Sequence, residues 1–141
     1  MQPSDITAIQ SRFFQIALST RPSAGSGVLL ADALGMVVTD VDDIAQCIDI
    51  ILHTPLGADP LRPDFGGDVD RYLDYPINMA RPHIAREIRT ALSRWEPRLN
   101  LVQVAVNPSD VAKLDVGIAW QIAAAYTKDV FVTNLAFGKL P

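Results

Sequence analysis

The chain has 141 residues, of which 49% are hydrophobic and 20% are charged, as expected for a single globular domain. Its net charge of −4 argues against nucleic-acid binding, which needs a basic surface. The N-terminus lacks the layout of a signal peptide, and Gln121 interrupts the longest apolar stretch, so we expect no membrane contact. The single cysteine, Cys47, excludes an internal disulfide.

The charges are unevenly distributed along the chain. Ten Asp and two Arg lie between Asp32 and Asp74, whereas five Arg and two Glu lie between Arg81 and Arg98. An acidic segment followed by a basic one predicts complementary faces, either within the fold or between subunits.

The N-terminal part of the chain is predicted to be helical. Residues 4–19 place apolar side chains at helical spacing, and a linker rich in Gly and Ser follows at 21–27. We therefore divide the chain into an N-terminal helix and linker extension, residues 1–35, and a main domain, residues 36–141. The helix is either a docking arm or a helix folded back on the domain. Two apolar runs, 28–33 and 36–39, indicate either an edge hairpin or irregular segments.

A clearer helix is predicted from Asp40 to His53. Acidic residues crowd its first turn, where the helix dipole favours anions, and one apolar stripe follows. Cys47 lies on that stripe, so we interpret it as a small core residue rather than a reactive thiol.

A loop rich in Pro and Gly is predicted at 54–67, which contains three prolines and three glycines. Asp64-Phe65-Gly66 has the letters of a kinase magnesium motif, but the chain is too short for a kinase and lacks the accompanying motifs. A short helix is predicted at 68–74.

The longest predicted helix begins at Asn78 or Met79, has Pro82 in its first turn, and ends at Trp95. It stops there because Pro97 lacks an N–H and disfavours a helical conformation at Glu96. Glu96 and Arg98 then form a charged corner around Pro97.

Three strands are predicted after this corner: Leu99–Val106, Lys113–Ala125 and Val130–Phe137. Turns are expected at 107–110 and 127–129. Short connections predict an antiparallel meander, so the fold class is α+β, with helices packed on a three-stranded antiparallel sheet. The last strand is expected to leave an open edge.

No catalytic or metal site is favoured. The two histidines, His53 and His83, lack further ligands at useful spacing, so no metal or other cofactor is expected. Glu96 is a candidate general acid for glycoside hydrolysis, with an Asp between Asp59 and Asp74 as its partner. Arg98 argues against that role, because a nearby cation lowers a carboxyl pKa that a general acid needs raised. The other interpretations are a salt-bridged helix end, or a charged clasp between helix and sheet that engages a partner.

Several segments, in this order, resemble the baseplate assembly protein W family of contractile-tailed phages, a lysozyme-like baseplate wedge family related to a type VI secretion baseplate subunit. They are Thr54-Pro-Leu-Gly57, Leu61-Arg-Pro-Asp-Phe-Gly66, Tyr72-Leu-Asp-Tyr-Pro76 and Ala91-Leu-Ser-Arg-Trp-Glu-Pro-Arg98. Two further segments look closest to the Mu-like branch, namely Asp42-Asp-Ile-Ala-Gln-Cys47 and Pro76-Ile-Asn-Met-Ala80. The first 35 residues lie outside this resemblance.

The resemblance implies a structural, non-enzymatic protein in the virion tail baseplate, assembled in the host cytoplasm in several copies. It implies that the protein joins the wedge to the hub and tube-initiator proteins, and that it starts the sheath by offering C-terminal strands to sheath subunits. The implied partner-binding residues are Trp95, Glu96, Pro97, Arg98, Phe131, Leu135 and Phe137. Two other functions stay open, a peptidoglycan hydrolase and a regulatory module of the anti-adaptor type.

Overall fold

The computed structural model describes residues 14–18, 37–110, 113–123 and 129–138. In chain order its elements are β1 (Phe14–Ile16), β2 (Val37–Thr39), α1 (Asp40–His53), the 3-10 helix η2 (Asp70–Tyr72), α2 (Ile77–Trp95), β3 (Leu99–Asp110), β4 (Lys113–Ile122) and β5 (Phe131–Gly138). This mixture of helices with an antiparallel sheet confirms the predicted α+β class. No helix in the described part of the chain is long and apolar enough to cross a membrane.

The main sheet has the order β3-β4-β5, with both pairs antiparallel, which confirms the meander. The turn predicted at 107–110 is wrong, because β3 continues to Asp110 and pairs with the start of β4. Pro108 lies opposite Leu114, next to a register shift, on a strand that has no second neighbour among the residues that the structure describes. An edge strand tolerates a proline because its missing N–H breaks no central ladder.

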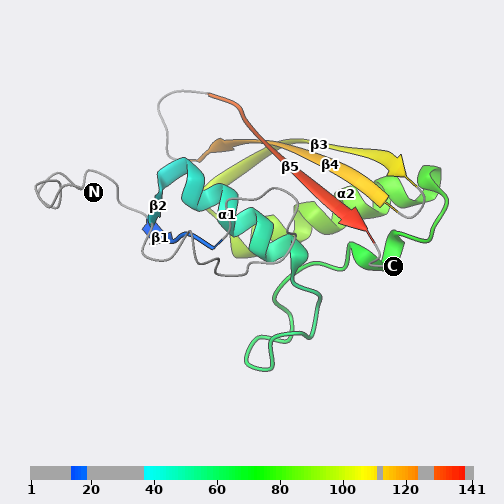
Figure 1. Ribbon diagram of the computed structural model, residues 1–141, viewed down its shortest axis with the longest axis horizontal. Helices are drawn as coiled ribbons and strands as arrows, with labels where there is room; N and C mark the ends of the chain where they lie inside the picture. The colour runs from blue at the N-terminus through cyan, green and yellow to red at the C-terminus, as the bar shows by residue number, and fades with distance from the viewer. Residues whose placement is uncertain (1–13, 19–36, 111–112, 124–128, 139–141) are drawn as a thin grey trace, which may run out of the picture.

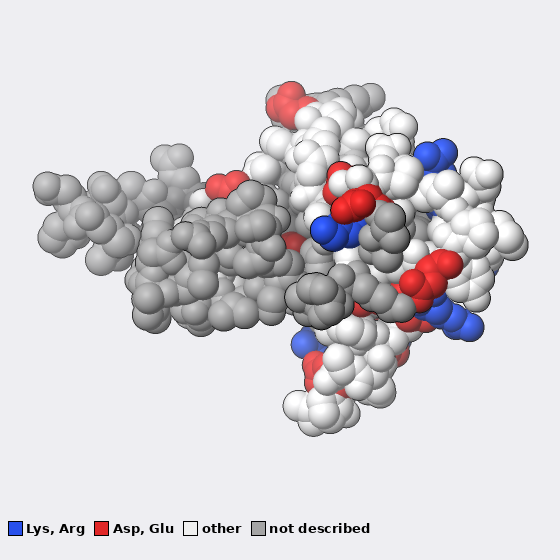
Figure 2. Space-filling view, turned by 45° about the vertical axis from the view of Figure 1, so that its right-hand side comes forward, with Lys and Arg blue, Asp and Glu red and all other residues white. Residues whose placement is uncertain are grey.

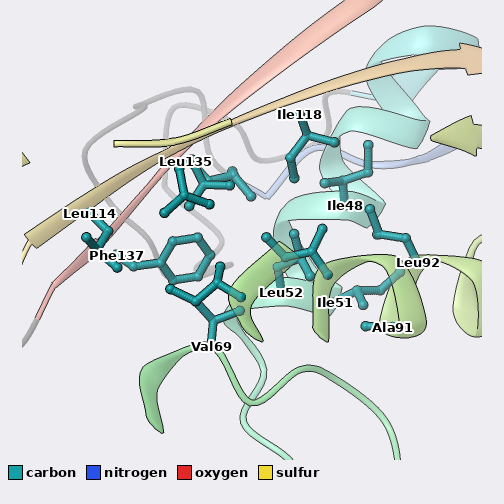
Figure 3. Close-up of a cluster of buried hydrophobic side chains, with 14 of the residues drawn as sticks. Ile48, Ile51, Leu52, Val69, Ala91, Leu92, Leu114, Ile118, Leu135 and Phe137 are labelled. Atoms are coloured by element: carbon teal, nitrogen blue, oxygen red, sulfur yellow. The ribbon is translucent and has the colours of Figure 1, made fainter. Parts of the chain in front are cut away.

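Both main helices cover the same face of this sheet (Figure 1). A single apolar core fills the space between the two layers, and Figure 3 shows side chains from α1, α2 and the strands converging there. Its fully buried members include Ile48 from α1, Ile88 from α2 and Trp120 from β4. The period-two pattern of β4 and the helical stripes of α1 and α2 therefore meet on one interior surface.

The observed bounds of α1 agree with the prediction, and η2 lies within the predicted short helix. The start of α2 differs, because the helix begins at Ile77 and places Pro82 beyond its first turn. Within a helix, Pro82 removes the hydrogen bond to the carbonyl of Asn78. Both residues are exposed, so water can satisfy that carbonyl.

The helix predicted over residues 4–19 is wrong for its described part, because Phe14–Ile16 forms strand β1, antiparallel to β2. Gln46 of α1 fixes this segment: its Nε2 donates to the carbonyl of Ile16 at 2.9 Å, and its Oε1 accepts from the N–H of Leu18 at 2.9 Å. Pairing with β2 and Gln46 thus outweighs the local helical pattern. The rest of that predicted helix, the linker at 21–27, the run at 28–33 and the turn at 127–129 lie wholly or mainly outside the described residues.

Candidate functional site

Glu96, Pro97 and Arg98 lie at the junction between α2 and β3. Glu96 has left the helical conformation, with φ −130° and ψ 75°, as expected for a residue before proline. Its N–H still donates to the carbonyl of Leu92 at 2.9 Å. The helix therefore ends at this residue, and the chain turns directly into the sheet.

The guanidinium of Arg98 binds two carboxylates. Its Nε lies 2.7 Å from Glu96 Oε1 and its Nη2 lies 2.6 Å from Glu96 Oε2, which is a bidentate pair. Its Nη1 lies 2.6 Å from Oδ2 of Asp43, in the first turn of α1. We call Asp43, Glu96 and Arg98 the clasp, because together they join both helices to the start of the sheet.

Both carboxylates of the clasp are buried, since Asp43 and Glu96 are each only 4% exposed. Burial raises the pKa of Glu96, but the hydrogen bonds and charge of Arg98 outweigh burial and hold this pKa below its ordinary value. The hydrogen bonds that Arg98 donates to Glu96, and then the one that it donates to Asp43, raise the pKa of Arg98 despite its partial burial. Glu96 and Arg98 therefore form a carboxylate–guanidinium pair, and Asp43 adds a second acidic side chain at the N-terminus of α1, where the helix dipole favours anions.

Cys47 and Gln15 complete the surroundings of the clasp. Cys47 Sγ lies 3.4 Å from Nη2 of Arg98 and 3.4 Å from Nε2 of Gln15. Burial, then the negative charges of Glu96 and Asp43, raises the pKa of the Cys47 thiol, which therefore stays neutral. Gln15 also donates to the carbonyl of Asp43 at 3.0 Å, a contact that sequence periodicity did not reveal.

This geometry does not suit acid–base or metal chemistry. A general acid at Glu96 would need a raised pKa and access to substrate, whereas Glu96 is ionised, buried and held by Arg98. Within the described ranges, no group of three or more His, Cys, Asp or Glu side chains is placed to hold a metal ion. The arrangement instead suits a structural role.

The neighbouring residues Trp95 and Pro97 face different surroundings. The half-buried Trp95 ring packs edge-on against Phe65, with ring centroids 5.1 Å apart, and Arg94 lies 5.1 Å above the same ring. Pro97 is exposed. Of the four predicted residues at this corner, Pro97 is thus the one that lies most openly at the surface.

The three predicted contact residues of β5 point toward the core. Leu135 and Phe137 are buried, and Phe131 is half-buried with its ring 5.1 Å from that of Trp120. Their side chains would have to leave the core to contact a partner. The accessible parts of β5 are its backbone edge and its outer face.

The outer face of the sheet is hollowed, with a cavity of about 600 Å³. Its floor consists largely of small residues, such as Ala105, Gly117, Ala119 and Ala136. These residues face away from the helices because they alternate with the buried positions of each strand. We did not predict this hollow, although the small residues of β4 that alternate with buried ones were a visible signal.

Comparison with known sequences gives two matches. Residues 38–126 match the sequence profile of a family described as baseplate wedge protein gp25. The chain is also similar to baseplate protein W of Escherichia phage P2, with 32% identity over 91 residues that cover 62% of this chain and 76% of that protein.

Comparison with solved structures gives similar folds. A candidate tail lysozyme from Geobacter sulfurreducens has 32% identity and a TM-score of 0.65, over 76% of this chain and 98% of that one. A chain in the postcontracted baseplate of pyocin R2 has 27% identity and a TM-score of 0.56, over 64% and 92%. A chain in a type VI secretion baseplate complex, with 20% identity and a TM-score of 0.55 over 70% and 91%, shares the fold.

Proposed function

This chain belongs to the baseplate wedge protein gp25 family, and on that premise we propose that its last strand provides the edge from which a contractile tail sheath begins. Family membership makes the protein a structural component of a baseplate wedge in a contractile tail system. The finer role, starting the sheath, rests on the position of β5.

The observation that carries this proposal is the free edge of β5. The strand pairs with β4 on one side and has no neighbour on the other within the described sheet. An unpaired row of N–H and C=O groups can accept a strand from another chain, and main-chain hydrogen bonds then provide the affinity. The buried side chains of Leu135 and Phe137 anchor β5 to the core, so the edge stays in place while a partner strand binds.

The contact of one backbone carbonyl indicates which residues of β5 direct their N–H and C=O groups toward the unpaired side of the strand. The carbonyl of Ala136 lies 3.3 Å from Nε2 of His53 in α1, so it points away from β4. The N–H and C=O of one residue point the same way, and alternate residues repeat this direction. The outward groups therefore belong to Val132, Asn134 and Ala136, with His53 covering the last of them.

The clasp supports this role indirectly. We infer that it fixes the end of α2 against α1 and the start of β3, while the exposed Pro97 is what a partner can contact. The proposed partners are the other wedge proteins, the hub and tube-initiator proteins, and the first sheath subunits. Assembly would take place in the host cytoplasm, with several copies in each baseplate.

Asn134→Pro tests the role of β5. It removes an outward N–H without removing one that pairs with β4, so the monomer should stay folded while strand addition is blocked. Cells that express the complete set of tail proteins with this variant should yield baseplates without polymerised sheath in electron micrographs. Asn134→Thr keeps the N–H and should give normal tails. Full-length sheath on the proline variant would refute the role of the edge.

A peptidoglycan hydrolase is not favoured. The only glutamate at the corner is ionised and bound to Arg98, as described above. The similar Geobacter chain carries a lysozyme description, but the geometry of this clasp gives it no support here.

A further inference from the structure

We propose that the loop of residues 54–67 is a preformed apolar knob that inserts its tip into an uncharged, apolar pocket of a different protein in the same baseplate. This inference rests on the proposed wedge function, but it concerns a surface separate from β5 and from the clasp.

The loop projects from the body of the molecule. It forms the lowest projection in Figure 1, and Figure 2 shows acidic and basic atoms close to the uncharged end of this projection. Leu61 is 92% exposed, more than any other large hydrophobic residue described, and Leu56 in the same loop is 48% exposed. A single exposed leucine is common, so the shape and support of the loop must carry the argument.

Hydrogen bonds hold the loop in one shape along its length. Two rungs join its sides, from the N–H of Gly67 to the carbonyl of Thr54 at 3.1 Å and from the N–H of Gly57 to the carbonyl of Pro63 at 2.9 Å. At the tip, Oδ1 of Asp59 accepts the N–H of Leu61 at 2.9 Å.

The base of the loop is anchored to α2 and to its own start. Phe65 packs edge-on against Trp95, and Asp64 forms an ion pair with Arg94. Gly66 is buried with φ +107°, and a Cβ there would lie 2.0 Å from the carbonyl oxygen of Thr54. At Gly66 the backbone therefore passes too close to Thr54 to leave room for a side chain. The base of the loop thus has a defined conformation that requires glycine.

This construction matters for binding because ordering a loop costs conformational entropy. A loop that is ordered before it meets its partner does not lose that entropy on binding. The exposed Pro60 and Pro63 also restrict the backbone beside the tip, which lowers the conformational entropy that binding would remove. An exposed apolar tip on a preformed support is thus suited to insertion.

The charges of the loop indicate the chemistry of the pocket. Asp59 pairs with Arg62 at 3.1 Å, and Asp64 pairs with Arg94. The guanidinium of Arg62 also lies 4.4 Å above the ring of Phe65, so it is held back against the loop. Because the charges beside the tip are internally paired, the pocket that receives Leu61 needs apolar walls and no balancing charge.

Leu61→Asp tests the knob in assembled particles. Tails are produced from the complete set of tail proteins, with the chain supplied as wild type, Leu61→Asp or Leu61→Met, and its amount per baseplate is measured by mass spectrometry. We expect Leu61→Asp to reduce incorporation roughly tenfold or more, because an ion cannot enter an apolar pocket. Leu61→Met keeps an apolar side chain of similar volume and should be incorporated normally. The purified Leu61→Asp chain should melt at the wild-type temperature, since Leu61 makes no core contact.

A photo-crosslinking residue at position 61 identifies what receives the tip. A crosslink to another baseplate protein supports the proposal, whereas a crosslink to a second copy of this chain overturns it. Equal incorporation of Leu61→Asp and wild type also overturns it, and leaves the wedge function standing. If wild type itself is missing from the particles, the proposed function fails, and the knob fails with it.

Discussion

Nη1 of Arg98 lies 2.6 Å from Oδ2 of Asp43, although fifty-five positions separate the two residues in the chain. This ion pair joins the first turn of α1 to the junction of α2 and β3. The corner formed by Glu96, Pro97 and Arg98 is therefore a tertiary crosslink within one molecule. Its first consequence concerns the stability of the monomer.

Arg98→Ala should destabilise the folded chain by about 3 kcal/mol or more, because two buried carboxylates lose their cation. Urea unfolding of the purified monomer measures this loss. Arg89→Ala, at an exposed position of α2, serves as the control and should change the free energy of unfolding by at most about 0.5 kcal/mol. Equal unfolding midpoints for Arg98→Ala and wild type would show that the clasp contributes nothing to the monomer.

Glu96 should make the fold sensitive to acid. Its pKa is lower in the folded chain than the ordinary 4.5, so its stabilising effect is complete above that pH and is lost as the pH falls through the lower folded value. Glu96→Gln has no carboxyl to titrate. Urea unfolding across this range should therefore show a flatter pH dependence for the variant, and parallel curves would contradict the assignment.

His53 should have the opposite pH dependence. Nδ1 of His53 lies 2.8 Å from Oδ1 of Asp49. This hydrogen bond raises the pKa of His53 above its ordinary value of 6.5, despite the opposing effect of burial. The stabilisation is thus complete below that pH and is lost as the pH rises through the folded pKa. Between about pH 6 and pH 8, unfolding of wild type should show this loss, and unfolding of His53→Gln should not. NMR titration of His53 itself gives an independent measurement, and a pKa at or below the ordinary value would refute the prediction.

Two glycines of the knob provide a matched pair. Gly66→Ala should destabilise the chain by roughly 3 kcal/mol, since the new methyl group would collide with Thr54 as well as strain the backbone. Gly57→Ala should cost only about 1 kcal/mol, because Gly57 also has a positive φ of +83° but nothing lies within 4 Å of its added Cβ. Thermal and urea unfolding of both variants measure the difference. Similar losses would mean that the close approach at Thr54 relaxes easily.

The elements with strong local signals could be predicted from the sequence. The bounds of α1 follow from its acidic first turn and apolar stripe, and the end of α2 follows from Pro97. The alternation in β4 indicated a strand with one buried face, and the structure confirms it. In each case the local pattern and the tertiary contacts favour the same structure.

The incorrect predictions concern segments whose secondary structure is determined by contacts with residues far away in the chain. The N-terminal segment has helical spacing, but Ile16 and Leu18 bond to Gln46 instead of to their own neighbours in a helix. Pro108 suggested a turn, but Leu114 lies opposite it in the sheet. Local propensity is a weak guide when a neighbouring strand or side chain satisfies the backbone.

The clasp was predicted only in part. Glu96 and Arg98 are two residues apart, so their ion pair follows from the sequence. Asp43 was recognised as an acidic residue near a helix start, but nothing in the local pattern connects it to Arg98. Asp43 is only 4% exposed, and its hydrogen-bond partners Arg98 and Gln15 both lie far from it in the chain.

The position of β5 makes the proposed addition of sheath strands depend on completed folding of this chain. Leu135 and Phe137 complete the interior only when this last strand has been synthesised and has paired with β4. A truncated or misfolded copy therefore cannot present the same edge. If sheath subunits add to that edge, they can begin only on copies whose folding is finished, and a defective copy would leave a vacant site without seeding a faulty tube.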